Sequence, residues 1–158
     1  MALLVPGVPT AMFGKLDDEF RLRGRIALTE VADKIKELAK FNASSQGWHQ
    51  YGTPTPATPG QGPAQISGTL VKSIDRSPVT REVFGYLCQV GTAAGMYPSY
   101  GSGIKSKASS KYGYILEVVG CRDGSRYPFL YRAAELGFNF YAPIIYKKKY
   151  GDKWARLI

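Results

Sequence analysis

Histidine, cysteine and long apolar runs are scarce in this sequence. The chain of 158 residues has one histidine, His49, and two cysteines, Cys88 and Cys121. One histidine excludes a zinc site built from several histidines, and a Ser-His-Asp arrangement would have to use a residue in a loop rich in proline and glycine. The cysteines lack metal-ligand spacing and cannot form a disulfide framework. We expect free thiols in a reducing compartment, with a single cross-strand disulfide as the alternative.

No apolar run approaches the roughly 20 residues that cross a bilayer. The apolar residues 2–5 are followed by Pro6 and Pro9 and have no basic residue before them. We therefore expect neither a membrane anchor nor a secretory signal. Hydrophobic residues make up 44% of the chain, enough for an ordinary core at this length, so we expect one soluble globular unit.

Basic charge lies mainly in the second half of the chain. Residues 1–71 carry 7 Lys and Arg and 6 Asp and Glu, a net charge of +1, whereas residues 72–158 carry 14 and 6, a net charge of +8. A field of this sign favours polyanions, acidic proteins or anionic surfaces without choosing among them.

The clearest helix covers residues 13–41. Acidic residues at positions 17–19 and Lys40 near the end suit the helix dipole. The other face is charged and balanced, so we expect one side of this helix to lie in water. Apolar or small residues recur at intervals of three and four, at positions 13, 16, 20, 24, 27, 31, 35 and 38.

Residues 42–65 predict a long loop, because they contain four prolines and four glycines. Compact domains seldom carry more than about 15 residues without secondary structure unless the segment binds something. Trp48 and Tyr51 lie in this loop, and aromatic side chains at such places are common interface anchors. The alternative is that both pack back onto their own domain.

The apolar period changes within residues 111–144. Residues 114–119 alternate as on a strand whose two faces both meet other surfaces. Asp123 and Gly124 then predict a tight turn, and Pro128 suits the start of a helix because it has no N–H to leave unbonded. The apolar face of that helix comprises Phe129, Ala133, Leu136, Phe140 and Ile144, and Pro143 is expected to kink or restart it.

Shorter elements lie between these segments. Residues 66–74 predict a short helical turn or the entry to a strand. Residues 81–91 predict a strand with Phe84, Tyr86, Cys88 and Val90 on one face, and residues 91–111 predict a second long loop.

These elements predict an α+β fold, in which a long N-terminal amphipathic helix and a C-terminal helix pack on a small antiparallel sheet with two long loops. We divide the chain into an extended arm, residues 1–12, a single domain, residues 13–146, and a basic tail, residues 147–158.

Lysines gather in the second loop and near the C-terminus. The glycines and serines at 101–106 do not form the GxxxxGK[ST] pattern of a phosphate-binding loop. The lysines contact a phosphate backbone if these segments face nucleic acid, and otherwise form a solvated surface. The candidates are Lys105, Lys107, Lys111, Lys147, Lys148 and Lys149.

Glu117 is a lone carboxylate within an apolar segment. A buried charge needs a partner, and we expect an ion pair, within the chain or between subunits, with Arg122, Arg126 or Arg132. General-acid catalysis is less favoured, because no second carboxylate lies at an obvious partner position. We predict no catalytic residue, no metal and no cofactor.

Three motifs occur together in order. Residues 68–74, GTLVKSI, are similar to a G-x-L-x-x-S-I signature. Tyr112 and Gly113 with Glu117 and Gly120 are similar to a Y-A…E-x-G segment. Residues 128–135 are similar to a P-F-L-x-P-A-x-E helix start. With the preceding amphipathic helix, this order resembles the neck, or tail-completion, proteins of long-tailed bacteriophages over roughly residues 13–146.

The resemblance implies a small, non-enzymatic α+β protein of the virion, assembled in the host cytoplasm. It would form a ring of six or twelve copies between the capsid portal and the tail tube, beside head-closure or portal-adaptor proteins and a tail terminator. The ring lumen would carry the phage DNA, and no membrane is involved. The candidates for contacts between subunits are Trp48, Tyr51, Glu117, Phe129 and Arg132.

Three other functions remain open at this point. The tail terminator of the same particle is also a small α+β ring subunit. A cellular nucleic-acid-binding module would use the same lysines, with Tyr112, Tyr114 and Tyr127 as stacking platforms. A small hydrolase or toxin would depend on His49 and Glu117.

Overall fold

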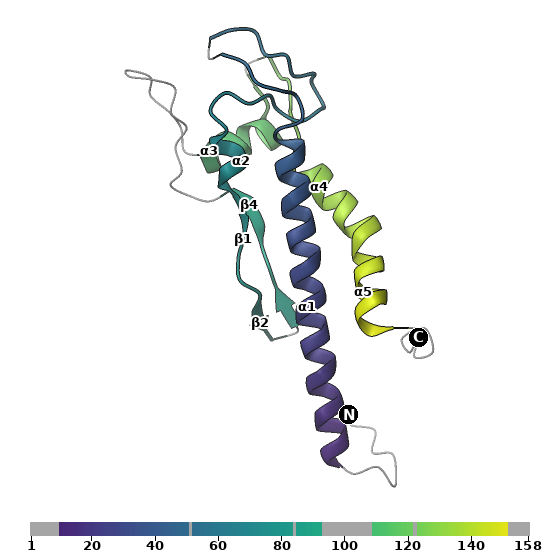
Figure 1. Ribbon diagram of the computed structural model, residues 1–158. Coiled ribbons are helices and arrows are strands. Elements are labelled where there is room, and N and C mark those ends of the chain that lie inside the picture. The colour runs from purple at the N-terminus through teal and green to yellow at the C-terminus, as the bar shows by residue number, and fades with distance from the viewer. Residues whose placement is uncertain (1–9, 51, 84, 93–108, 122, 152–158) are drawn as a thin grey trace.

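A computed structural model describes residues 10–50, 52–83, 85–92, 109–121 and 123–151 of the chain. Its longest element is α1 (Thr10–Asn42), and the rest of the fold is arranged along this helix. A β-hairpin lies along one side of α1 and the C-terminal helices lie along the other (Figure 1). The other elements are α2 (Thr69–Ser73), β1 (Ile74–Arg76), β2 (Thr80–Glu82), β3 (Gly85–Leu87), β4 (Val90–Thr92), α3 (Ser109–Tyr114), the π-helix η1 (Ile115–Val119), α4 (Leu130–Leu136), the π-helix η2 (Gly137–Tyr141) and α5 (Ala142–Tyr150).

The structure confirms the predicted N-terminal helix and places its start at Thr10. Ala27, Val31, Ile35 and Ala39 recur every four residues, and all four side chains are buried. They form one stripe because a helix brings every third or fourth residue to the same face. Val31, Ile35 and Ala39 of this stripe lie in the main core, which also contains Ile74, Phe129 and Ala133.

The antiparallel hairpin consists of two short ladders. β1 pairs with β4, and Ile74 lies opposite Thr92; β2 pairs with β3, and Arg81 lies opposite Tyr86. The residues 81–91 that were predicted as one strand therefore belong to three short strands, the end of β2, all of β3 and the start of β4. The predicted alternation is confirmed from β3 to β4, where Tyr86, Cys88 and Val90 are half-buried and Leu87 and Gln89 are exposed. Phe84 lies outside the described residues.

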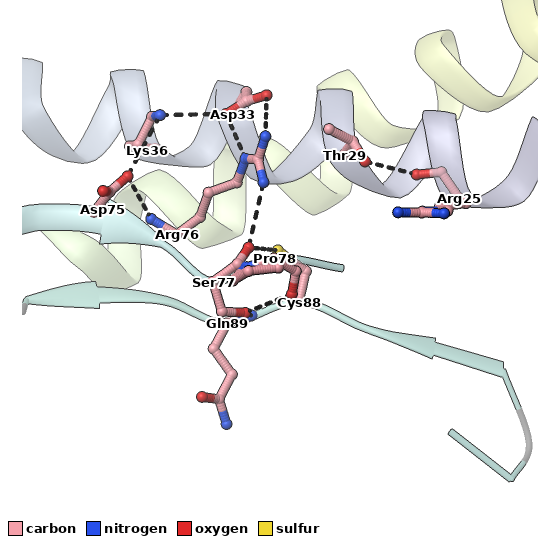
Figure 2. Close-up of polar contacts among 10 residues, drawn as sticks. All are labelled: Arg25, Thr29, Asp33, Lys36, Asp75, Arg76, Ser77, Pro78, Cys88 and Gln89. Atoms are coloured by element: carbon pink, nitrogen blue, oxygen red, sulfur yellow. Dashed lines mark hydrogen bonds and ion pairs between the residues drawn. The ribbon is translucent and has the colours of Figure 1, made fainter. Parts of the chain in front are cut away.

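Arg76 ties the base of the hairpin to α1. Its Nε donates to Asp33 Oδ1 at 2.6 Å and its Nη2 donates to Asp33 Oδ2 at 3.1 Å, a bidentate pair (Figure 2). Lys36 Nζ lies 3.3 Å from Asp33 Oδ1 and 3.6 Å from Asp75 Oδ1. Asp75 and Arg76, the last two residues of β1, thus hold the hairpin against the long helix.

The prediction of a strand at residues 114–119 is wrong. This segment continues α3 as the π-helix η1 and ends at Gly120, where φ is +91°. Only Leu116 among the alternating residues is deeply buried, against Ala57 and Tyr127, whereas Val118 and Val119 are exposed. A short apolar run does not distinguish strand from helix by its period, and here the tertiary packing decides in favour of helix.

The turn after η1 matches its prediction. Asp123 Oδ1 accepts a hydrogen bond from the Ser125 backbone N–H at 2.9 Å, and Gly124 has φ of +79°. Cys88 and Cys121 are both free and half-buried, which agrees with the expectation of thiols and not with the alternative disulfide.

The loop at residues 42–65 contains no helix after α1 and no strand within its described part, as predicted, but it is folded against the body. Trp48 and Gln65 form a parallel bridge, and the Gly60 N–H donates to the Arg126 carbonyl at 2.8 Å. A Cβ at Gly62 would lie 1.8 Å from the Asn42 carbonyl oxygen, so this close approach of two backbones requires glycine.

The α+β fold class is confirmed. The loop that follows β4 lies mostly outside the described residues, which resume at α3. None of the helices in the described ranges is both long enough and apolar enough to cross a membrane.

Candidate functional site

The C-terminal helices expose much of the apolar face that the sequence predicts for residues 129–144. Leu136, Phe140 and Ile144 are 48%, 55% and 53% exposed, and we refer to these three residues as the apolar ridge. Ala133 and Gly137 occupy the buried positions instead, while Ala142 and Ile145 pack against the core. Of the predicted apolar face, only Phe129 and Ala133 are therefore buried in the single chain.

The π-helix η2 explains the difference at Phe140 and Ile144, whereas Leu136 precedes it. Each π-helical residue turns less about the axis than an α-helical one, so a pattern extrapolated through η2 loses its phase. At the start of η2, Gly137 allows close contact with α1, because a Cβ there would lie 2.3 Å from Ile35 Cγ1. Pro143 follows as the second residue of α5, a position that tolerates a missing N–H. Tyr141 and Ala142 keep right-handed helical angles, so the helix continues from η2 into α5, and the predicted restart at this proline is not confirmed.

Exposed apolar side chains also occur on the N-terminal half of α1. The body of the protein covers the helix from Ala27 onward, whereas its first turns extend past the hairpin and α5 (Figure 1). Phe20 stacks at a tilt on Tyr150, with ring centroids 5.0 Å apart, and is still 45% exposed. Leu22 and Ile26 are 56% and 39% exposed.

Glu117 does not use an arginine of the described residues as its partner. Its carboxylate accepts hydrogen bonds from the backbone N–H groups of Phe129 at 2.8 Å, Leu130 at 3.1 Å and Tyr131 at 2.6 Å. These groups lie at the start of α4, where backbone donors have no partner within the helix. Glu117 thus caps α4, which corrects the predicted pairing with Arg126 or Arg132 within the chain. Arg122 lies outside the described residues.

The other predicted interface residues fall in different environments. Phe129 is 1% exposed, so its side chain belongs to the core of a single chain, which corrects its assignment as a contact residue. Arg132 is exposed and donates to Gln61 Oε1 at 3.3 Å. Trp48 is 64% exposed, although the edge of its ring covers Gly68. Tyr51 lies outside the described residues.

Among the described residues, the predicted DNA-facing lysines lie in two separate places. Lys111 lies in α3, near one end of α1, whereas residues 147–149 lie at the end of α5, toward the other end (Figure 1). Lys149 is engaged in an ion pair with Glu30, and Lys148 is exposed. Lys105 and Lys107 lie outside the described residues.

His49 lines a cavity of about 410 Å³ between the 42–65 loop and the segment from α3 to Tyr127. The His49 ring makes a polar contact with Thr53, whose Oγ1 lies 3.5 Å from His49 Nδ1. Burial, together with the nearby Asp123 carboxylate, raises the pKa of the Cys121 thiol in the same cavity. Within the described residues, no group of three or more His, Cys, Asp or Glu side chains is arranged to hold a metal ion.

The apolar ridge is the feature that sequence reasoning missed. The sequence places its three residues on one helix face but does not indicate that this face is exposed. Gly137, a poor helix former within this pattern, is the residue at which the π-helix η2 begins. Comparison with known proteins finds no matching family model, no matching curated protein and no matching solved structure.

Proposed function

We propose that this chain is a non-enzymatic structural subunit of a tailed-phage virion, forming a ring in the neck that joins the portal and head-closure complex to the tail tube. The carrying observation is the apolar ridge on α4–α5, together with the exposed apolar side chains of α1. A ring subunit presents two different surfaces to its two neighbours, because head-to-tail contacts close into a ring when the rotation allows.

The two apolar surfaces lie on different helices, one on α1 and one on α4–α5. A head-to-tail contact between subunits requires two different surfaces of this kind. Single exposed apolar residues are common on monomers, but apolar residues on successive turns of one helix favour a partner. Leu136, Phe140 and Ile144 are spaced by four residues along the helix, so a neighbouring subunit could cover all three with one element. Among proteins that assemble into rings, the order of the three sequence motifs favours a phage neck protein.

The test is quantitative mass spectrometry of purified tailed particles, counting this chain against the portal protein. A constant six or twelve copies per particle supports a neck ring. Purified tails and purified heads, analysed separately, locate the ring and distinguish a neck subunit from the tail terminator. Absence of the chain from intact particles overturns the proposal.

A further inference from the structure

An apolar groove of about 220 Å³ opens on α1 between the hairpin and α4. Buried side chains of α1 form its floor, the segment from β3 to β4 forms one wall, and α4 with η2 forms the other. None of the described side chains that line it carries a charge. The lining residues that reach the surface are Leu28, Cys88, Val90, Leu130, Ala134 and Phe138.

The size and polarity of this groove decide which kind of partner it fits. Pockets for small molecules usually have about 300–1,000 Å³, so the groove is too small for most cofactors and metabolites. A phosphate group or a nucleic acid would meet no cationic side chain among the described lining residues. Both properties favour an apolar side chain from another protein segment, because such anchors fill small, dry pockets at interfaces.

The apolar ridge and the groove lie on opposite sides of the same helix. Leu136 and Phe140 each follow a groove residue, Ala134 and Phe138, by two positions. Residues two apart on a helix point to nearly opposite sides of it. Ala133 is buried in the main core with residues of α1, so α4 rests on α1 with the groove on one flank and the ridge on the other. A chain therefore cannot fill its groove with its own ridge, whereas a second copy can.

The ridge has the spacing that packing into a groove requires. Its three side chains recur every fourth residue, and rows of this spacing are the ridges that fit the grooves of a facing surface. Three half-exposed side chains of this size expose on the order of 300 Å², enough to mark an interaction site. A stable interface buries roughly 800 Å² per partner, and its rim is polar. The exposed polar side chains beside the ridge are Arg132, Glu135, Asn139 and Lys148.

We propose that the groove receives the apolar ridge of a second copy of this chain, so that Phe140 of the partner subunit lies between the Cys88 wall and α4. This inference rests on the proposed ring function and deepens it, because it names the two surfaces that meet. Ridge and groove face different ways, so each copy binds two neighbours, which is the head-to-tail contact that a ring needs. The receiving surface is the part of α1 that lies beside the hairpin and α4.

The first test is disulfide cross-linking of the full chain through the native Cys88 thiol. In a C121S background, L136C, F140C and I144C each place one thiol on the ridge, and copper phenanthroline is the oxidant. At least one of the three should give a ladder of dimers, trimers and larger products in a non-reducing gel, because every copy carries a ridge thiol and a groove thiol. A contact of ridge against ridge would stop at the dimer and overturn the proposal.

The matched control for cross-linking is N139C, at an exposed position of the same helix. It should give much less product than the best ridge variant. Addition of C88S removes the groove thiol and should abolish the ladder. A ladder from none of the ridge variants, an equal ladder from N139C, or a ladder that survives C88S overturns the placement of the ridge in this groove.

The second test mixes two variants and needs no cross-link. L136S/F140S removes the ridge, whereas A134Q/F138S puts a polar side chain into the groove and removes part of its wall. Each variant alone should associate at least about tenfold more weakly than the wild type in sedimentation velocity. An equal mixture should form a heterodimer and stop there, because one intact ridge and one intact groove remain between the two chains.

Circular dichroism and thermal unfolding verify that each variant folds. A mixture that stays monomeric while the wild type associates overturns the proposal. A wild-type chain that stays monomeric at every concentration overturns it as well.

The contact and the neck function fail separately. If the chain is absent from particles but the ladder and the heterodimer form, the contact stands and the neck function is wrong. If particles contain a fixed number of copies but neither the ladder nor the heterodimer forms, only the contact is wrong.

Discussion

The carboxylate of Glu117 and the backbone N–H of Phe129 are 2.8 Å apart, and this contact joins η1 to the start of α4 across the intervening turn. The same carboxylate accepts from Leu130 and Tyr131. A negative charge at a helix N-terminus is favourable because the helix dipole is positive there. Glu117 therefore positions the helix that carries the apolar ridge.

Replacement of Glu117 by alanine is expected to lower the free energy of unfolding by about 1–2 kcal/mol, because the first turn of α4 loses its side-chain acceptor. E117Q should have an intermediate effect, since one carbonyl oxygen remains to accept. The measurement is urea unfolding at neutral pH. E135A, at an exposed position of α4, is the control and should change the free energy by no more than about 0.5 kcal/mol. Equal effects of E117A and E135A would contradict the capping role.

The Asp33–Arg76 pair predicts a pH dependence of stability. The hydrogen bond from Arg76 is the main factor that holds the pKa of Asp33 below its ordinary value of 3.8, and burial opposes it. A carboxyl whose pKa is lower in the folded state stabilises the protein above the unfolded pKa, and this contribution is lost as pH falls through the folded pKa. The difference in urea midpoint between wild type and D33N should therefore be largest above pH 3.8 and shrink below it.

The R76Q background provides the control for this pH dependence. Without the guanidinium, D33N should produce a smaller change with pH, because only Lys36 remains beside the carboxylate. A difference between wild type and D33N that stayed constant from neutral to strongly acidic pH would show that the pair does not contribute through Asp33 ionisation.

The contact between Gly137 and Ile35 predicts that G137A destabilises the protein. The new Cβ would lie 2.3 Å from Ile35 Cγ1, and overpacking of this kind costs about 1–3 kcal/mol, more than the roughly 1 kcal/mol that alanine adds to helix propensity. G91A is the control, because no heavy atom lies within 4 Å of its Cβ. The I35A/G137A double variant should be less destabilised than the sum of the two single variants. A more stable G137A would refute the close packing.

The apolar ridge predicts a variant that folds but does not assemble. L136S/F140S changes half-exposed side chains, so its free energy of unfolding should stay within about 1 kcal/mol of the wild type. Self-association, measured by sedimentation velocity, should weaken at least about tenfold, which corresponds to about 1.4 kcal/mol. The E135S/N139S variant alters the adjacent exposed positions of the same helix and should associate normally. Loss of assembly in both variants, or in neither, would count against the ridge as a contact surface.

The sequence alone determined the elements whose pattern is local and long. The helix of residues 10–42 has regular apolar spacing over many turns, and residues 42–65 have the proline and glycine content of a loop. The turn at Asp123 and Gly124 follows from the conformational preferences of those two residues. The α+β class could be predicted because it requires only the types of elements and their order.

Only the tertiary structure decided the conformation of residues 114–119, the exposed face of α4–α5 and the partner of Glu117. A short apolar segment suits a strand or a helix until its neighbours are in place, and Leu116 is buried against Ala57 and Tyr127 as part of a helix. The π-helix η2, which begins at Gly137, changes the helix phase, and Phe140 and Ile144 are exposed. Long-range contacts of this kind have no local signal in the sequence, so their consequences emerge only in the folded chain.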